Sequence, residues 1–497
     1  MNMKRISVVR SLFVILALTL LAGCGGGSGS SPNTNAPLSA GNINLIFVVS
    51  PDLANDPLGD IDQDTANLTN QGLQRSLRMA PYLKQQVLGG NNVTAIYALS
   101  PMTHLQNANK YSDIPDMTAI GFIQQFALLN QITLPVAPTS IYTGNNYPLF
   151  VQYGGEEDVP SGVFPPSSYI TGARGLAFDD LHDYNIGLVN RIIEAKQSGF
   201  YVFSAPWKTT GDLLAKINIL YGYNLNFPTT YLGSNFVYVI SITPSPSGSA
   251  SLVTYNSNLH PPSTYPVLPA PVASAACTNK FQPYFSTVLT RGVNAVGANE
   301  SSTIYIVRHA EAHPDSLFGF DDGNYVAAGQ WRALSLANAL KGKISPDKVY
   351  SIDPAGIWYP NYNFNVSYVR PSLTVLPYAI ANNLPYYLAA GISLGSAFNP
   401  TDATVAQDTS NFFFTGGTFS NQTLLVAWES GHIKPFLNAL LSSYGVSSDK
   451  LLPTSWPSED YDTIWTVILD AQGNLTVHNA LCEGIDSSKL PATAPQF

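Results

Sequence analysis

Residues 304–313 read IYIVRHAEAH. The four apolar residues at the start of this stretch favour a buried β-strand, because strands covered on both faces form continuous apolar runs. Arg308 and His309 follow where that strand ends. Open α/β sheets bind their ligands at the carboxyl ends of their strands. The pair is therefore a candidate functional site that needs support from the rest of the chain, because arginine and histidine also end ordinary strands.

The composition restricts the classes of protein that the chain can belong to. Its 497 residues predict two domains of roughly 200 residues each. Charged residues make up 11% of the chain, against roughly 25% in ordinary soluble domains, so Ser, Thr, Asn and Tyr must supply much of the polarity. The formal net charge of -9 argues against a nucleic-acid partner, because binding to a phosphate backbone requires clustered Lys and Arg.

The amino-terminal residues have the pattern of an export signal. Basic residues precede the apolar run 12–21, which is too short for a good membrane span. Residues 21–24 read LAGC and resemble a bacterial lipobox, which implies removal of residues 1–23 as a signal peptide and lipidation of the Cys24 thiol. Residues 24–41 predict a flexible tether, because they are rich in Gly, Ser, Pro and Asn. We expect an exported lipoprotein, anchored to the membrane on the periplasmic side of the outer membrane or at the cell surface; the alternative is an ordinary signal peptide followed by a chance cysteine.

Cys277 and Cys482 are the other two cysteines. In an exported protein they either form a disulfide that closes the second half of the chain or remain thiols. The sequence contains neither a CxxC nor an HExxH spacing, so it predicts no metal centre. We also expect no cofactor.

A repeated pattern divides the chain into two halves. The Pro-rich residues 259–275 predict a linker between one domain at residues 42–258 and another at residues 276–497. Four segments of the first domain match segments of the second in the same order, which predicts two tandem α/β domains. These matches are 46–49 with 304–307, 95–101 with 348–354, 201–204 with 424–427, and 252–256 with 475–479.

A helix is expected after the first strand of each half, because apolar or small residues recur there at the i, i+3, i+4, i+7 spacing of one buried face. The positions are Ala333, Leu336, Ala337 and Leu340 after Gly329, and Ser76, Met79, Ala80 and Leu83 after Gly72. Farther along, Thr118 matches Thr374. The first half also holds extra residues, which we place at 137–168.

The second half resembles the histidine phosphatase (phosphoglycerate mutase-like) superfamily. The resemblance implies a three-layer α/β fold for each half, with the first half a degenerate copy. The motifs that carry it are Arg308-His309-Ala310-Glu311, Gly329 with Arg332-Ala333, Tyr350-Ser351-Ile352-Asp353, Arg370 before Thr374, and His432. In one of these motifs Ala310 stands where the family usually has glycine.

The resemblance also implies roles for these residues. His309 would attack phosphorus, since a neutral imidazole is nucleophilic when a hydrogen bond fixes its tautomer. Arg308 and Arg370 would clamp the phosphoryl oxygens, and His432 would donate a further hydrogen bond. The family's commonest register places the second histidine at Glu429, so either Glu429 or His432 occupies that position.

The acid that protonates the leaving group is not identified by sequence. Glu429 is the nearest candidate, and Glu311 and Asp353 are the alternatives.

The first half lacks the catalytic residues of the second. Residues 50–51 read Ser-Pro where Arg308-His309 stand, Ile114 falls at the position of Arg370, and Thr209 falls at the position of His432. No second active site is therefore expected. The extra residues of this half include three tyrosines that serve either as a binding surface or, as we expect, as a cover over their own domain; they are Tyr142, Tyr147 and Tyr153.

We expect an exported, lipid-anchored phosphohydrolase. As a histidine acid phosphatase-like phosphomonoesterase, it would form a phosphohistidine on His309 and act on a phosphorylated small molecule or surface group. The alternative is a non-catalytic surface lipoprotein that binds phosphorylated or sugar ligands in a decayed pocket. Neither the substrate nor the oligomeric state follows from the sequence.

Overall fold

The structure is a computed structural model, and within it residues 35–497 form one compact unit. It describes residues 35–54, 59–101, 115–137, 140–142, 145–151, 153, 175–178, 180, 182–245, 248–277, 284–292, 295, 297–313, 322–355, 357–358, 366–389, 403–452 and 456–497. The signal peptide, Cys24 and Ile114 lie outside this described part. No helix within it has both the length and the apolar character needed to cross a membrane.

The first half contains a five-stranded sheet in the order β2-β5-β1-β6-β7. Its central strand β1 is parallel to β5 and antiparallel to β6. All seven residues of β1 are buried, which explains the continuous apolar run in its sequence. The strands are β1 (Ile43–Val49), β2 (Ala95–Ala98), β5 (Gly199–Ala205), β6 (Phe236–Ile242) and β7 (Ala250–Asn256).

The second half contains a seven-stranded sheet in the order β13-β10-β14-β9-β15-β16-β8. The run β10-β14-β9-β15-β16 has the same order and the same strand directions as β2-β5-β1-β6-β7. The strands are β8 (Ser286–Leu289), β9 (Ser302–Arg308), β10 (Lys348–Ser351), β13 (Tyr386–Leu388), β14 (Thr423–Trp428), β15 (Thr463–Leu469) and β16 (Leu475–Cys482).

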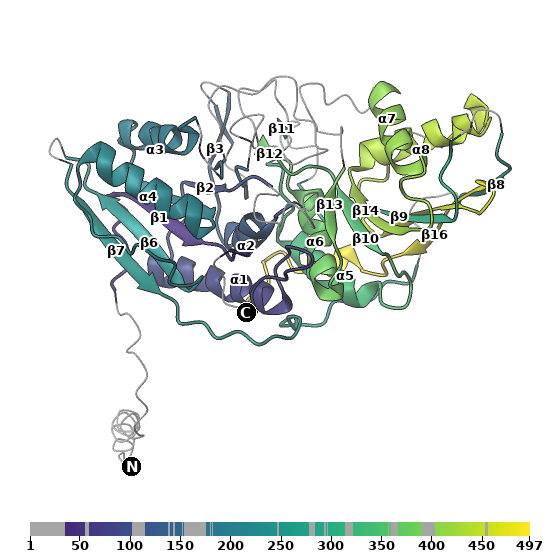
Figure 1. Ribbon diagram of the computed structural model, residues 1–497. Helices are drawn as coiled ribbons and strands as arrows, with labels where there is room; N and C mark the ends of the chain where they lie inside the picture. Colours follow the sequence, from purple (N-terminus) through teal and green to yellow (C-terminus); the bar gives the residue numbers. More distant parts are fainter. Residues whose placement is uncertain are drawn as a thin grey trace, which may run out of the picture. The chain divides into compact units, whose positions relative to one another are not determined.

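Helices pack in pairs against each sheet, which gives an α/β fold (Figure 1). In the first half α1 packs on α2 and α3 on α4, and in the second half α5 packs on α6 and α7 on α8. The helices are α1 (Asn70–Tyr82), α2 (Thr118–Ala127), α3 (Tyr184–Glu194), α4 (Trp207–Tyr221), α5 (Ala327–Ala339), α6 (Arg370–Asn382), α7 (Ala403–Phe414) and α8 (Ser430–Ser443). One-turn helices are η1 (Leu83–Val87), η5 (Ser448–Lys450) and η6 (Ser487–Lys489), and the short strand pairs are β3 (Leu134–Ala137) with β4 (Ser140–Tyr142) and β11 (Ile357–Trp358) with β12 (Val366–Ser367).

The strand pairing corrects the expected match between the halves by one residue in the first strand. The backbone N–H of Ser50 donates to Ala205 O at 3.0 Å, and that of His309 donates to Trp428 O at 3.0 Å. Ser50 therefore holds the position of His309, which the sequence comparison had given to Pro51. The error arises because the matched stretches 46–49 and 304–307 are continuous apolar runs, so no alternation fixes their register.

The expected match of residues 252–256 with residues 475–479 is also out of register. Pairing across each sheet places Leu252 opposite Ile240 and Val477 opposite Val467. Because Ile240 and Val467 both face the same position of the central strand, Leu252 corresponds to Val477 and not to Leu475. A pairing irregularity between β15 and β16 shows that offsets within this strand pair are not constant.

Two glycines lie in the first turns of helices, before the apolar faces that they were expected to precede. Gly329 is in the first turn of α5, and a Cβ there would approach Tyr325 Cβ to 2.7 Å and Glu311 O to 2.9 Å. Gly72 occupies the first turn of α1, where a Cβ would collide with the Asp60 backbone. Close packing of the helix start against a preceding loop therefore requires glycine at both places.

The two halves contact each other through their helices and through the carboxyl-terminal residues. The side-chain amides of Gln124 in α2 and Asn324 exchange two hydrogen bonds, of 2.9 and 3.0 Å. Gln125 Nε2 donates to Pro495 O at 2.7 Å, and Trp331 Nε1 donates to Thr493 O at 2.8 Å. One continuous apolar core runs through both halves.

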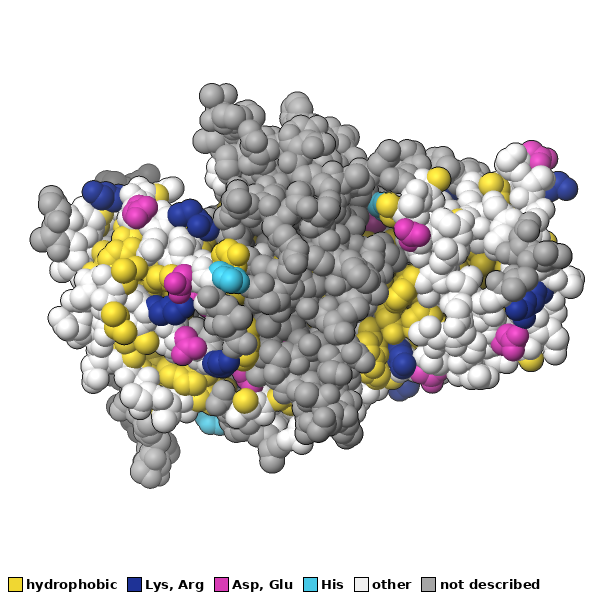
Figure 2. Space-filling view, turned by 45° about the horizontal axis from the view of Figure 1, so that its top comes forward, with side chains coloured by type: hydrophobic (Ala, Val, Ile, Leu, Met, Phe, Trp, Pro, Cys, Tyr) yellow, Lys and Arg dark blue, Asp and Glu magenta, His cyan; other side chains and the backbone are white. Residues whose placement is uncertain are grey.

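Residues 257–273 form no helix or strand. Figure 2 shows that on the described part of one face Lys, Arg, Asp and Glu side chains are interspersed and few, in keeping with the low charged fraction.

Candidate active site

Three neighbouring strands of the second sheet deliver polar residues to the same edge. Strands β10, β14 and β9 are parallel, and one row of paired residues across them consists of Ser351, Ala427 and Val307. Two residues beyond that row the chains reach Asp353, Glu429 and His309. Since neighbouring strands lie about 4.8 Å apart, Asp353 and His309 are separated by about 10 Å at the backbone, with Glu429 between them.

His309 is buried and neutral. Its side chain is 1% exposed, and Nδ1 lies 2.8 Å from the carbonyl oxygen of Ala310. Burial lowers the pKa of His309 well below its usual value, the charges of Arg370 and Arg308 lower it further, and the Ala310 carbonyl opposes them. A carbonyl only accepts hydrogen bonds, so Nδ1 carries the proton. Nε2, which has no partner among the described residues, then presents a lone pair.

Arg308 is held by main-chain carbonyls and by an aromatic ring. Its Nη1 donates to Ser458 O at 2.9 Å and to Asp460 O at 3.3 Å. The guanidinium lies 4.1 Å from the ring centroid of Tyr461, where a cation is attracted by the π-face. Nε of Arg308 has no partner within the described part of the chain.

Arg370 is the first residue of α6 and packs on a second tyrosine. Its guanidinium lies 4.7 Å from the ring centroid of Tyr368, and Nε donates to Tyr368 Oη at 3.2 Å. The rings of Tyr368 and Tyr461 also contact His309, with centroids 6.4 and 6.1 Å away. Each tyrosine therefore contacts one arginine and the histidine.

Glu429 and His432 both belong to the site, because α8 begins at Ser430 directly after β14. His432 Nδ1 lies 3.0 Å from Glu429 Oε2, and Ser430 Oγ donates to Glu429 Oε1 at 3.0 Å. Burial alone would raise the pKa of Glu429, but the hydrogen bond and charge of His432 and the charges of Arg308 and Arg370 outweigh it and lower the pKa to about 2. Glu429 is thus an ionised carboxylate among cations.

Asp353 has the opposite character. Burial raises its pKa to about 6, although hydrogen bonds from the Ala355 N–H, at 2.9 Å, and from Tyr153 Oη, at 3.1 Å, partly offset the rise. Both donors bind Oδ1, and Oδ2 has no partner among the residues that the structure describes. Asp353 therefore takes up a proton much more readily than Glu429 does, and its Oδ2 is available for a further contact.

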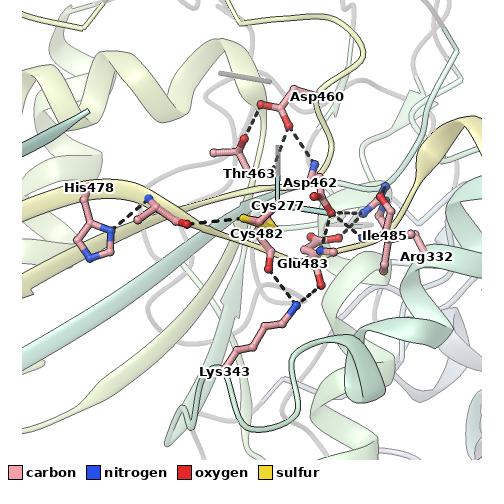
Figure 3. The surroundings of a disulfide bond; sticks show 12 residues. Cys277, Arg332, Lys343, Asp460, Asp462, Thr463, His478, Cys482, Glu483 and Ile485 are labelled. Atoms are coloured by element: carbon pink, nitrogen blue, oxygen red, sulfur yellow. Dashed lines mark hydrogen bonds and ion pairs between the residues drawn. A yellow bond between two sulfur atoms is a disulfide. The ribbon is translucent and has the colours of Figure 1, made fainter. Parts of the chain in front are cut away.

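Glu311 binds Arg332 instead. Its carboxylate takes a two-pronged hydrogen bond from Arg332, with distances of 2.8 to 3.0 Å. Arg332 is completely buried and also binds Glu483, and Asp462 lies 3.8 Å away. Figure 3 shows Asp462 and Glu483 near Arg332, beside the disulfide that joins Cys277 and Cys482, whose Cα atoms are 5.6 Å apart.

The site contains residues to which the sequence assigned no role. Thr374 Oγ1 accepts the backbone N–H of Ala310 at 2.8 Å and donates to Arg370 O at 2.7 Å, so it ties the loop after β9 to the start of α6. Ala310 does not have a positive φ, which explains why alanine fits there. The spacing of Arg370 and Thr374 signalled this link, whereas nothing in the sequence signalled Tyr461.

The expected local cover over the first half is wrong for two of its tyrosines. Tyr153 binds Asp353, and the Tyr147 ring stacks on His313 with centroids 6.3 Å apart. Both partners belong to the second half. The Tyr142 side chain lies outside the described residues.

Fold and site together define an α/β protein in which a buried neutral histidine lies with two arginines at the carboxyl edge of a mixed sheet. No family model and no curated protein matches the chain. A phosphoserine phosphatase from Entamoeba histolytica, solved with phosphoserine, matches at 17% identity over 36% of this chain and 96% of its own, with a TM-score of 0.19. The protein histidine phosphatase SixA, solved with tungstate, matches at 19% identity over 36% of this chain and 97% of its own, with a TM-score of 0.21. Likeness at this level decides nothing about activity.

Proposed function

We propose that the protein is a phosphohydrolase that cleaves phosphomonoesters through a phosphohistidine on His309. The observation that carries the proposal is the state of that side chain: Nε2 is buried, unprotonated and without a partner among the described residues. Arg308 and Arg370 act on it strongly enough to lower its pKa. A nucleophile held among fixed positive charges is what transfer of an anionic phosphoryl group requires.

Arg308 and Arg370 bind the phosphoryl oxygens, because guanidinium groups match phosphate with paired hydrogen bonds. The amino terminus of α8 points backbone N–H groups at the same edge and favours an anion there. Glu429 keeps His432 oriented for a further contact. Nε2 of His309 then attacks phosphorus as the bond to the leaving oxygen breaks.

Asp353 protonates the leaving oxygen in this proposal. Glu429, with a pKa of about 2, holds no proton at neutral pH, whereas the pKa of Asp353 is about 6. A general acid works best when its pKa lies near the operating pH. In the second step Asp353 takes a proton from water, the water oxygen bonds to phosphorus, and the bond from phosphorus to Nε2 breaks.

The first half is proposed to be a duplicated copy without a nucleophile, spanning residues 42–258, with 276–497 as the catalytic domain. The shared strand order and the matched helix pairs support this. Ser50 stands in the position of His309. Thr209 is the third residue of α4, as His432 is the third residue of α8.

Export and anchoring through a lipid on Cys24 are also proposed, on the strength of the apolar run and the LAGC sequence at residues 21–24. Incorporation of labelled fatty acid into the chain, and its loss in Cys24→Ala, would test the anchor. Equal labelling of both chains would refute it.

Hydrolysis of 4-nitrophenyl phosphate by the full chain and by His309→Ala tests the activity. We expect His309→Ala to lose several orders of magnitude in rate, and the wild type to form an acid-labile phosphoprotein. His260→Ala is the matched control, because His260 is exposed in the linker. Phosphate binding without turnover by the wild type would support the non-catalytic ligand-binding alternative, and equal rates for wild type and His309→Ala would remove His309 from the mechanism.

A further inference from the structure

A segment of the first half crosses onto the second half. Within residues 145–153, the backbone N–H of Val151 donates to Ser367 Oγ at 2.9 Å, and that of Tyr147 donates to Asp322 Oδ2 at 2.6 Å. We call residues 145–153 the crossing segment. Its residues 146–151 and 153 are buried. Two main-chain anchors thus fix its path along the catalytic half.

The crossing segment contacts the site on two sides. On the side of β10, Tyr153 Oη donates to Asp353 Oδ1 across 200 residues of sequence, and both side chains are buried. On the side of β9, Tyr147 stacks on His313 with the rings 10° apart, and His313 follows His309 by one short loop.

We propose that the first half completes the active site, and that Tyr153 is a positioning residue that fixes which oxygen of Asp353 carries the transferable proton. The inference rests on the proposed function, because it needs Asp353 to act as the general acid. Oδ1 accepts two hydrogen bonds, from Tyr153 and from the Ala355 N–H. A carboxyl oxygen that accepts two donors is a poor place for a proton, so the proton resides on Oδ2, which has no partner among the described residues.

The hydrogen bond from Tyr153 to Asp353 also determines how loss of the Tyr153 hydroxyl should shift the pH profile. The Tyr153 hydroxyl stabilises the carboxylate and so lowers the pKa of Asp353, against the larger effect of burial. Besides Tyr153, the titratable group coupled to Asp353 is Tyr386 of β13, whose pKa burial raises and whose hydroxyl bonds Ser351. Removal of the Tyr153 hydroxyl therefore raises the pKa of Asp353. An acid must be protonated to act, so the rate persists to higher pH.

The experiment compares pH profiles of kcat/KM for the full-length wild type, Tyr153→Phe and Tyr147→Phe, with an alkyl phosphate whose poor leaving group depends on the acid. We expect the alkaline limb of Tyr153→Phe to move upward by about half to one pH unit. Tyr147→Phe is the matched control, because the contacts of Tyr147 that we describe use its backbone and ring. Its limb should not move. With 4-nitrophenyl phosphate, which leaves readily without an acid, the shift of the alkaline limb of kcat/KM in Tyr153→Phe should be smaller.

An unchanged or lowered limb in Tyr153→Phe, or the same shift in both variants, would overturn the inference. The His309→Ala variant distinguishes failure of this inference from failure of the proposed function. If His309→Ala is inactive and the alkaline limb of Tyr153→Phe is unchanged, only the role of Tyr153 is refuted. If His309→Ala is active, the mechanism itself is refuted. If Tyr153→Phe does not fold, Ser367→Ala loosens the crossing segment through its Val151 anchor. That variant should shift the limb in the same direction by less, and no shift would also count against the inference.

Discussion

Replacement of Arg332 by methionine should cost the protein a large part of its stability. Arg332 is completely buried and binds Glu311 and Glu483, with Asp462 near by. Burial, together with Asp462, raises the pKa of Glu483 to about 8 although Arg332 opposes the rise. When Arg332 is removed, Glu483 can therefore take up a proton, so that it does not remain as a buried unpaired charge. Glu311 loses the two-pronged bond that neutralises it, and most of the cost arises there.

Breaking a buried ion pair by removing one partner typically costs about 3–5 kcal/mol, and we expect a loss in that range at pH 8. The loss should be smaller at pH 5, where the stranded carboxyls are more easily protonated. Urea unfolding at the two pH values, followed by tryptophan fluorescence, measures it. Arg291→Met is the control, because Arg291 pairs with Glu300 at the surface and should cost less than about 1 kcal/mol.

Two outcomes would refute this reasoning. One is a loss for Arg332→Met no greater than that for Arg291→Met, and the other is a loss that grows toward pH 5. Adding Glu311→Gln to Arg332→Met removes the carboxylate at which most of the cost arises and should recover part of the stability.

Two further outcomes are expected. Joint replacement of Cys277 and Cys482 by serine removes a cross-link between residues 205 apart. It should lower the free energy of unfolding by about 5 kcal/mol on the chain-entropy estimate. Identical urea midpoints for the wild type with and without reductant would contradict this expectation. Burial raises the pKa of Asp116 from 3.8 to about 7, so its contribution to stability is fully present below pH 3.8 and is lost as the pH rises through 7. Asp116→Asn, which keeps the acceptor for the Thr118 N–H, should therefore show a smaller decline in urea midpoint between pH 4 and 7, and a steeper decline would be evidence against the assigned state of Asp116.

The elements that could be predicted from sequence are those in which the spacing of apolar side chains reflects which face is buried. The buried strand 304–307 and the helical face at Ala333 and Leu336 are examples, because apolar periodicity records which face is covered. The meeting of Arg308 with Arg370 followed only from the family resemblance. Periodicity places residues on elements, but it does not bring two elements together.

The remaining features depend on contacts that no local pattern records. Glu311 and Asp353 are both acidic residues after a strand, and only their surroundings separate them: Arg332 neutralises Glu311, while burial raises the pKa of Asp353 to about 6. The choice between Glu429 and His432 was posed as exclusive, yet the turn from β14 into α8 brings both to the site. The contact of Tyr153 with Asp353 could not be predicted, because the two residues are 200 positions apart in the sequence.

The hydrogen bonds from Gln125 and Trp331 to the carbonyls of Pro495 and Thr493 have a consequence for biosynthesis. One donor lies in each half, so both halves bind the segment around residues 493–495. A nascent chain can fold each sheet earlier, but it gains these two contacts only once residues 493–495 have left the ribosome. A chain truncated after residue 492 would keep every residue of the site and lose both contacts.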